Sequence, residues 1–325
     1  MNKKERVLAA IAGDPVDRTP FSLWLHNFAR ENTAQELRDE TVELYEAFDW
    51  DFLKPQSRPM CFAQMWGLCI EPSTQRAVWP TTTYFPVQNA KDFASLRPAD
   101  PSSGALAEQL EAYTLIRDAV GKDVPIVATV FSPLMVASFM FPDGYADLRN
   151  LMIESPRELE EGLAAISETL TEYAGLCHEA GFEGIFYATN LANHGMMTPE
   201  QFNRFQRPFD TPILHASKGP FNILHMCGDH ILFEELKDYP ASVFSWATTS
   251  KNPSLSEVHE CTQKAVLGGL PGKPSIKSMS EAELLDHGRQ SLEEMRGRPH
   301  LLGPDCSINP DTPRELIGSI SKLFQ

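Results

Sequence analysis

The segment His225-Met226-Cys227-Gly228 carries the residues of this chain with the clearest capacity for chemistry. On an extended strand, side chains two positions apart point to the same face. His225 and Cys227 can therefore bind one metal ion together, while Met226 packs on the opposite side. Gly228 then lets the backbone turn without crowding that site. A further cysteine, Cys306, closes another apolar run, so the pattern predicts a metal site with three protein ligands.

An imidazole and two thiolates suit zinc, and three protein ligands leave a fourth position for water or substrate. Zinc held in this way lowers the pKa of a bound thiol or water and presents it as a nucleophile near neutral pH. Because two thiolates already balance the charge of the ion, such a site favours the activation of a soft thiol over the formation of hydroxide. The alternative is that the three residues only pack, since free cysteines are common in protein cores.

The elements that must position these residues can be read from the alternation of short apolar runs with longer amphipathic stretches. Short, nearly continuous apolar runs are typical of parallel strands buried on both faces. Their repeated alternation with helices predicts a (β/α)8 TIM barrel, with residues 1–325 forming a single domain. An open doubly wound sheet is the competing fold, but no Gly-x-Gly-x-x-Gly fingerprint follows the first run. The expected strands are Phe21–His26, Phe52–Gln56, Pro125–Phe131, Phe182–Thr189, Phe221–Cys227, Val243–Ala247, Ala265–Gly269 and Leu301–Cys306.

Several expected helices have recognisable ends. Pro156–Gly181 carries apolar residues at helical spacing and stops at a glycine. Ser254–Gln263, Ser280–Gly297 and Thr312–Phe324 begin with residue types that cap helix N-termini, and two of these three also fit a capping box. These helices fill the connections between the later strands of the expected barrel.

Two segments extend the basic barrel. Residues 1–20 predict an N-terminal helix that ends at Gly13 and leads into the first strand. The insertion after the second strand, from about residue 57 to residue 120, is too long for one helix. Within it, Gln75–Phe85 alternates well enough to form a small hairpin over the barrel mouth.

The polar residues at the ends of the expected strands are the candidates for catalysis, because the chemistry of a TIM barrel takes place where its strands end. Of these residues, His26, Asn27 and Tyr187 are predicted to be catalytic, through contact with substrate. The alternative for His26 and Asn27 is a hydrogen-bonded core or loop pair, and for Tyr187 a buried tyrosine with a satisfied hydroxyl. The strand-end residues are His26, Asn27, Gln56, Ser132, Asn190, His225, Cys227, Thr248, Thr249 and Cys306, with Tyr187 just before the end of the fourth strand.

Composition excludes several classes of partner. The formal net charge is −16, and basic residues do not gather into a patch, which argues against binding to nucleic acid or to anionic membranes. No stretch approaches the roughly 20 apolar residues needed to cross a bilayer. The charged, amphipathic N-terminus differs from a signal peptide, so a cytoplasmic protein is expected. The 6 cysteines are too sparse for a disulfide-stapled fold of this size.

Segments spread over nearly the whole chain resemble the uroporphyrinogen decarboxylase-like superfamily. The similar segments are Glu5–Gly13 followed by Asp17–Pro20, then Gly181–Tyr187, Leu267–Gly269 and Cys306–Pro313. The fold that the resemblance implies is the same (β/α)8 barrel.

Decarboxylases and methyltransferases of this superfamily differ at positions that can be compared. The decarboxylases carry an Arg-Gln-Ala-Gly-Arg run after the first strand, whose arginines hold substrate carboxylates. Here the corresponding stretch Leu25–Arg30 retains at most one arginine and places His26 and Asn27 in that region. The decarboxylases also lack zinc ligands, whereas the corrinoid-dependent methyltransferase branch has a His-x-Cys and a late Cys. His225, Cys227 and Cys306 match those three positions, so the resemblance implies bound Zn2+.

The resemblance further implies transfer of a methyl group between a corrinoid and a small thiol or methylated substrate. The chain shows no Asp-x-His-x-x-Gly cobalamin-binding signature, so the corrinoid (cobalamin) is expected in trans, either free or on a carrier protein. Two alternatives stay open at this point. One is a metal-free decarboxylase that acts on a porphyrin or another carboxylate, and the other is a non-catalytic barrel that binds a corrinoid.

Overall fold

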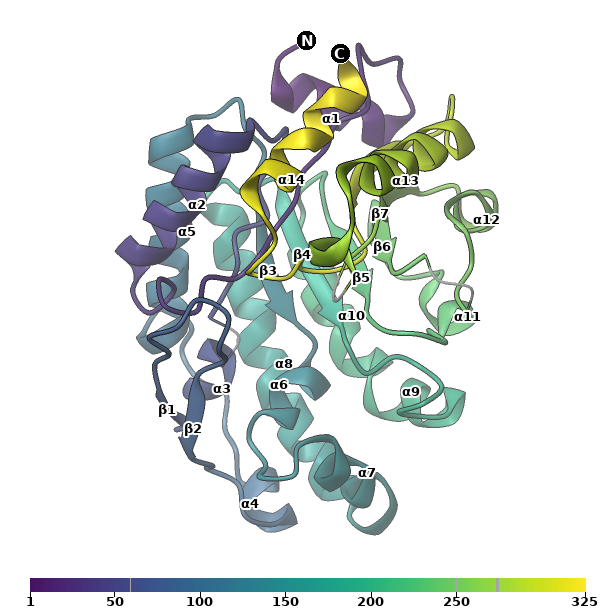
Figure 1. The fold of residues 1–325 in the computed structure, drawn as a ribbon. Coiled ribbons are helices and arrows are strands. Elements are labelled where there is room, and N and C mark those ends of the chain that lie inside the picture. The colour runs from purple at the N-terminus through teal and green to yellow at the C-terminus, as the bar shows by residue number, and fades with distance from the viewer. Residues whose placement is uncertain (59, 249–250, 273–274) are drawn as a thin grey trace.

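Six parallel strands form the central sheet, and each is hydrogen-bonded to the next strand along the chain (Figure 1). The computed structural model describes residues 1–58, 60–248, 251–272 and 275–325. The strands are β3 (Val127–Phe131), β4 (Gly184–Thr189), β5 (Ile223–Met226), β6 (Val243–Trp246), β7 (Ala265–Leu270) and β8 (His300–Pro304). They confirm the last six expected strands, with small shifts at the ends.

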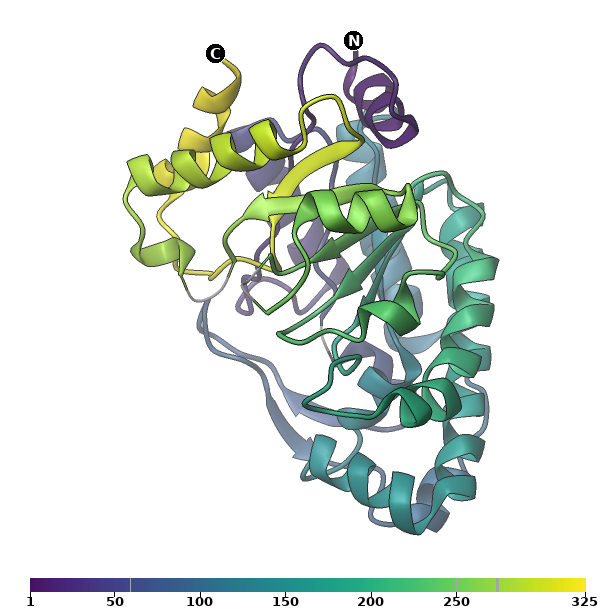
Figure 2. The same cartoon turned by 90° about the vertical axis from the view of Figure 1, so that its right-hand side faces the viewer.

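Helices cover the outside of this sheet. The turned view shows α12 and α13, in green and yellow-green, along the outer side of the strands (Figure 2). The helices are α1 (Lys3–Ala12), α2 (Ala34–Phe48), α3 (Cys61–Gln64), α4 (Ala90–Ala94), α5 (Gly104–Val120), α6 (Pro133–Ser138), α7 (Tyr145–Glu154), α8 (Pro156–Glu179), α9 (Pro199–Phe205), α10 (Arg207–Ala216), α11 (Phe233–Leu236), α12 (Leu255–Thr262), α13 (Glu281–Glu294) and α14 (Arg314–Ser319). Short 3-10 helices span Ile276–Ser278 and Ile320–Phe324. Within the described ranges, no helix is both long and apolar enough to cross a membrane.

Two extended segments complete the ring between β8 and β3, but they are not regular strands. Phe21–His26 forms a parallel bridge with Leu302 of β8, and Phe52–Gln56 forms one with Ile126 just before β3. The prediction of eight barrel positions is therefore confirmed as an architecture of six strands and two bridged segments. The prediction of regular strands over the first two positions is wrong.

Two prolines explain why these ladders stop. A parallel ladder continues only while alternate N–H groups donate to the neighbouring segment. Pro304 has no N–H that could donate to Ser22, and Pro55 has none for Val127. The hydroxyl of Thr129 donates to the carbonyl of Pro55 at 3.0 Å, in place of a backbone bond.

A buried carboxylate joins the two irregular segments. Asp51 is fully buried, and its side chain accepts a hydrogen bond from the Phe21 N–H at 2.9 Å, while its own N–H donates to the Phe21 carbonyl at 2.9 Å. Arg6 of α1 contacts the same carboxylate at 2.7 Å and Arg18 contacts it at 2.5 Å. Interactions of the Asp51 side chain thus hold the two bridged segments together where few backbone hydrogen bonds join them.

The two faces of the ring have different roles. Trp24, Phe52, Phe186 and Ala188 belong to the cluster that fills the barrel interior. Because Ala188 pairs with His225 in the parallel register, the imidazole shares this inner face. The intervening residues of the strands pack outward against the helices.

The insertion after the second segment forms the expected hairpin, although its first strand lies earlier in the chain. β1 (Cys69–Glu71) pairs antiparallel with β2 (Thr81–Tyr84), whereas the expected hairpin was confined to Gln75–Phe85. Figure 1 shows both termini at one end of the molecule and this hairpin toward the other end, near α4 and α7.

Helix ends follow the sequence signals in most places. Gly13 ends α1 in the left-handed conformation, and Ser254 and Ser280 close capping boxes at α12 and α13. Thr312 is an exception, because its hydroxyl donates to the Asn309 carbonyl at 2.7 Å. The final helix α14 therefore begins later than expected, at Arg314.

Candidate metal centre

The ends of two strands that are not adjacent in the sheet, β5 and β8, bring the three predicted ligands together. His225 lies on β5, Cys227 directly follows that strand, and Cys306 lies two residues beyond β8. One donor atom of each residue lies within 4.8 Å of the donor atoms of the other two. The structure therefore assembles the trio that the spacing predicted, with the imidazole buried and the two cysteines half-buried.

The hydrogen bonds of His225 leave one ring nitrogen for a ligand. Nδ1 lies 3.2 Å from the Ser245 hydroxyl on β6, and the ring stacks on Phe186 with centroids 5.0 Å apart. Nε2 is buried and has no hydrogen-bond partner among the described residues. A buried nitrogen without a partner is costly unless something binds it, so the imidazole and the two sulfurs fit a soft cation such as zinc.

The charges around the trio favour a thiolate. The pKa of Cys306 is held well below its ordinary value by the hydrogen bond from Cys227, with His225 adding to this effect and burial opposing it. The charge of Lys54 lowers the pKa of Cys306 further. Because the thiolate is the form of cysteine that binds metal ions, the lowered pKa of Cys306 favours metal binding at this site.

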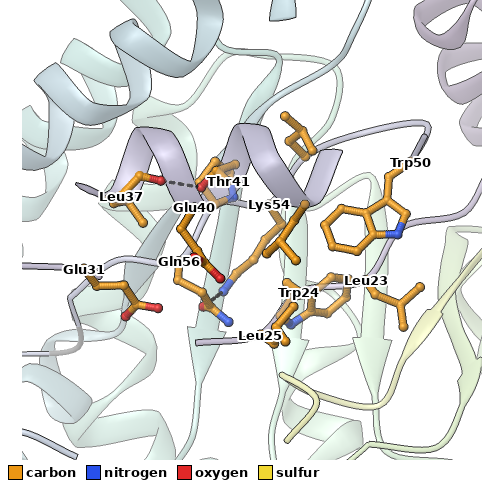
Figure 3. Close-up of a pocket in the computed structure, with 13 residues that line it drawn as sticks. Leu23, Trp24, Leu25, Glu31, Leu37, Glu40, Thr41, Trp50, Lys54 and Gln56 are labelled. Carbon is orange, nitrogen blue, oxygen red and sulfur yellow. Dashed lines mark hydrogen bonds between the residues drawn. The ribbon is translucent and has the colours of Figure 1, made fainter. Parts of the chain in front are cut away.

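Lys54 is a site residue that the analysis of strand ends did not identify. It is buried, donates to the Gln56 side-chain oxygen at 2.7 Å, and its Nζ lies 4.8 Å from the centre of the Phe186 ring. Figure 3 shows Lys54 and Gln56 among the residues of a small pocket beneath α2 that Glu31 and Glu40 also line. The signal in the sequence is a charged residue inside the otherwise apolar run Phe52-Leu53-Lys54.

His26 and Asn27 lie at the rim of the barrel beside the loop that holds Cys306. Leu25 bridges Ile308, two residues after Cys306. Both predicted residues are buried, and Nδ1 of His26 lies 2.8 Å from a carboxylate oxygen of Glu31. The structure therefore brings both of them to the mouth of the barrel, on the segment that bridges the loop after Cys306.

Tyr187 lies elsewhere, and this position corrects the prediction that it is catalytic. It pairs with Leu224 in the register, on the face opposite to that of His225. Its hydroxyl donates to Asp210 of α10 at 2.6 Å, and the residue is fully buried. The alternative interpretation, a buried tyrosine with a satisfied hydroxyl, describes its position.

The buried carboxyl of Asp210 makes the stability of the folded protein depend on pH. Burial raises the pKa of this carboxyl to about 7, although hydrogen bonds from Tyr187 and Tyr239 act in the opposite direction. An unfolded chain releases the same proton near pH 4. Between about pH 4 and pH 7 the folded protein therefore binds a proton that the unfolded chain has lost, so this contribution to stability is lost as the pH rises.

The Asp210→Asn variant should lack this dependence. We expect the free energy of unfolding of the wild-type protein to fall relative to that of the variant by up to about 1.4 kcal/mol per pH unit across this window. Urea unfolding at several pH values between 4 and 8 measures the difference. Parallel pH profiles for the two proteins would show that Asp210 does not titrate in this way.

Three other strand-end residues, Gln56, Ser132 and Thr248, have structural partners. The Gln56 amide donates to the Ser307 hydroxyl at 2.9 Å, and Ser132 caps α6. The N–H of Thr248 donates to Asp305 at 3.2 Å, and burial raises the pKa of that carboxyl to about 6. Thr249 lies outside the described residues.

An apolar cleft opens between the hairpin and the start of α7. Trp79 and Tyr145 are the exposed aromatic residues that line it, with Met60, Phe139 and Phe141 deeper. Burial raises the pKa of the Tyr145 phenol, and the charge of Cys227 adds to this shift. The lining of the cleft is mostly apolar.

Comparison with known proteins agrees with this geometry. The sequence profile of the family described as "Uroporphyrinogen decarboxylase (URO-D)" matches residues 2–323. Among curated proteins, the chain is 25% identical to "Methylcobamide:CoM methyltransferase MtaA" of Methanosarcina barkeri, over 98% of this chain and 96% of that protein. It is 24% identical to a uroporphyrinogen decarboxylase of Koribacter versatilis, over 73% of this chain and 68% of that protein.

A solved structure shares the fold over the full length. A methyltransferase from Methanosarcina mazei superposes with a TM-score of 0.87 at 22% identity, covering 100% of this chain and 98% of that one. At this level of identity the similarity shows the fold. It confirms the predicted barrel architecture.

Proposed function

Because the chain belongs to the uroporphyrinogen decarboxylase family, we propose that its barrel serves a zinc-dependent methyltransferase. The methyl group passes between a corrinoid, supplied free or on a carrier protein, and a small thiol or methylated substrate. The similarity to a methylcobamide:CoM methyltransferase supports this assignment. Of the two directions, a thiol as the methyl acceptor fits a centre with two thiolate ligands better.

The observation that carries the proposal is the partnerless buried Nε2 of His225 beside two thiol sulfurs. His225, Cys227 and Cys306 would hold the zinc ion, which when bound stabilises a substrate sulfur in its nucleophilic thiolate form. Ser245 and Phe186 fix the imidazole ring, one through Nδ1 and the other through stacking. Such outer partners keep a metal-binding histidine in one orientation.

The barrel mouth supports a role for a large, flat partner. The apolar cleft lined by Trp79 and Tyr145 opens at the same end as the ligands. Side chains of this kind match the face of a macrocycle better than they match a highly charged ligand. The proposal therefore assigns the cleft to the corrinoid and the barrel interior to the small substrate.

The arginine at the rim argues against decarboxylation of a polycarboxylate. Arg30, the one arginine in the stretch where decarboxylases hold substrate acids, contacts Glu40 at 2.8 Å and Glu43 at 2.7 Å. Its charge is therefore balanced by carboxylates of the protein itself. A porphyrin with several acid groups needs cations that can turn to the substrate.

Two measurements test the proposal. Elemental analysis of the purified protein should find about one zinc per chain, and methylcobalamin with a panel of small thiols should yield thioether and reduced cobalamin. Conversion of uroporphyrinogen without zinc would support the decarboxylase instead. Stoichiometric zinc without methyl transfer in either direction would leave a non-catalytic corrinoid-binding barrel.

A further inference from the structure

We propose that His26, oriented by Glu31, is the base that removes the proton from the substrate thiol. This inference rests on the proposed methyltransferase function and adds the residue that handles the proton of the reaction. It assigns His26 to catalysis and Glu31 to the positioning of His26.

Both oxygens of the Glu31 carboxylate form hydrogen bonds with residues at the rim of the barrel. One lies 2.8 Å from Nδ1 of His26, and the other accepts the backbone N–H of Asn27 at 2.5 Å. Glu31 is only 3% exposed, so water competes little for these bonds. Because an ionised carboxylate can only accept, Nδ1 must carry the hydrogen, which leaves Nε2 as a basic lone pair.

The ring is placed for a role at the mouth of the barrel. Trp24 belongs to the inner cluster and Leu25 to the outer one, so alternation along the segment puts His26 on the inner face. Trp24 also accepts the N–H of Ile308 at 2.9 Å, which fixes this segment beside the Cys306 loop. Among the described residues, no hydrogen bond uses Nε2 of His26.

Aromatic rings hold the imidazole in place. His26 stacks on Phe28 with centroids 4.6 Å apart, and it makes an edge-to-face contact with Trp79 with centroids 6.2 Å apart. Trp79 also lines the apolar cleft, so His26 lies between the cleft and the barrel interior. The ring is therefore fixed by a carboxylate on one side and by aromatic packing on the other.

Asn27 provides independent evidence that a ligand binds here. The residue is 6% exposed, and its Oδ1 is buried without a hydrogen-bond partner within the part of the chain that the structure describes. A buried acceptor of this kind is stabilised when a donor group of a ligand forms a hydrogen bond with it. Together with the unused imidazole nitrogen of the preceding residue, this unused carbonyl oxygen suits a small substrate that carries a thiol and a second hydrogen-bond donor.

The proposed step balances without another reactant. The S–H bond breaks and its proton passes to Nε2 of His26, while the sulfur electron pair forms a bond to the methyl carbon of the methyl-corrinoid. The cobalt–carbon bond breaks and its electron pair stays on cobalt, which is reduced from Co(III) to Co(I). The proton then leaves His26 for water at the rim.

Glu31→Gln tests the positioning role. The backbone N–H of Asn27 needs the amide oxygen of the glutamine, so the NH2 group must face Nδ1 and move the imidazole proton to Nε2. We expect 15N chemical shifts of His26 to report Nδ1–H in the wild-type protein and Nε2–H in the variant. This readout is independent of zinc and of turnover.

His26→Gln tests the base directly. With 2-mercaptoethanol and methylcobalamin at pH 8, we expect kcat to fall about 100-fold or more in His26→Gln and in Glu31→Gln. With thiophenol, which is already ionised at that pH, the loss should shrink to a few fold. His259→Gln is the matched control, because His259 is bonded through Nδ1 to the Lys264 carbonyl on the outside of the barrel.

The outcomes are distinct. Equal losses with both thiols, or unchanged 15N shifts in Glu31→Gln, would overturn the proton-transfer role. Loss of zinc from His26→Gln would also overturn it, because His26 would then be a ligand. If the wild-type protein holds no zinc and moves no methyl group, the proposed function itself fails, while the tautomer of His26 can still be measured. If Glu31→Gln does not fold, the comparison of thiols in His26→Gln decides alone.

Discussion

Replacement of Cys306 by serine is expected to reduce bound zinc from about one ion per chain to a trace. A hydroxyl is a far weaker ligand for zinc than a thiolate, and the two remaining ligands would hold the ion poorly. Methyl transfer should fall by more than the roughly 10–100-fold loss that follows from mutation of outer partners of a metal site. Elemental analysis and a methylcobalamin assay measure the two effects.

The same substitution should leave the barrel folded. Cys306 lies in a loop beyond β8 and is half-buried, so it contributes little to either hydrophobic cluster. We expect Cys227→Ala to behave in the same way, and Cys261→Ser on the exposed end of α12 to keep full zinc and activity. Unfolding of both site variants, or full zinc content in Cys306→Ser, would contradict the assignment of the ligands.

Asp51→Ala is expected to cause the largest loss of stability, about 3–5 kcal/mol in the free energy of unfolding. The substitution leaves the buried guanidinium of Arg6 without its inner partner and removes the acceptor of the Phe21 N–H. It also weakens the junction between the two bridged segments, where few backbone bonds exist. Urea unfolding monitored by circular dichroism measures the change.

Asp39→Ala is a suitable control for this experiment. Asp39 also pairs with an arginine, Arg38, but both side chains are about one-third exposed, at 35% and 36%. Exposed pairs contribute little to stability, so the midpoint of unfolding should hardly move. An equally small effect of Asp51→Ala would mean that the ring closes without its buried carboxylate.

The sequence supports strong expectations where a pattern is local. Continuous apolar runs predict β3 to β8, and the His-x-Cys spacing predicts that two ligands share one face of β5. Pro304 and Pro55 are visible in the sequence as well, but their effect depends on which carbonyl lies opposite each of them. That information exists only once the register between segments is known, so the irregularity of the first two positions was not predictable.

The errors at the site have the same origin. Tyr187 lies near the end of β4, but its face depends on pairing with β5, which directs it outward to Asp210. Lys54 acts on Cys306, which is distant from it in the sequence, and Glu31 pairs with His26 across a turn. A single sequence does not show either pairing. Residue types and spacing therefore predicted which three side chains gather at one site, whereas burial and pairing decided which neighbours surround them.

The closeness of the two sulfurs has a consequence for handling the protein. Cys227 and Cys306 are half-buried, and their sulfur atoms lie within 4.8 Å of each other. Dioxygen or another mild oxidant can join such neighbours into a disulfide, which removes both ligands at once. A metal ion held by these sulfurs would therefore protect them against oxidation, and we expect protein prepared in air without a reductant to bind less zinc than protein prepared with one.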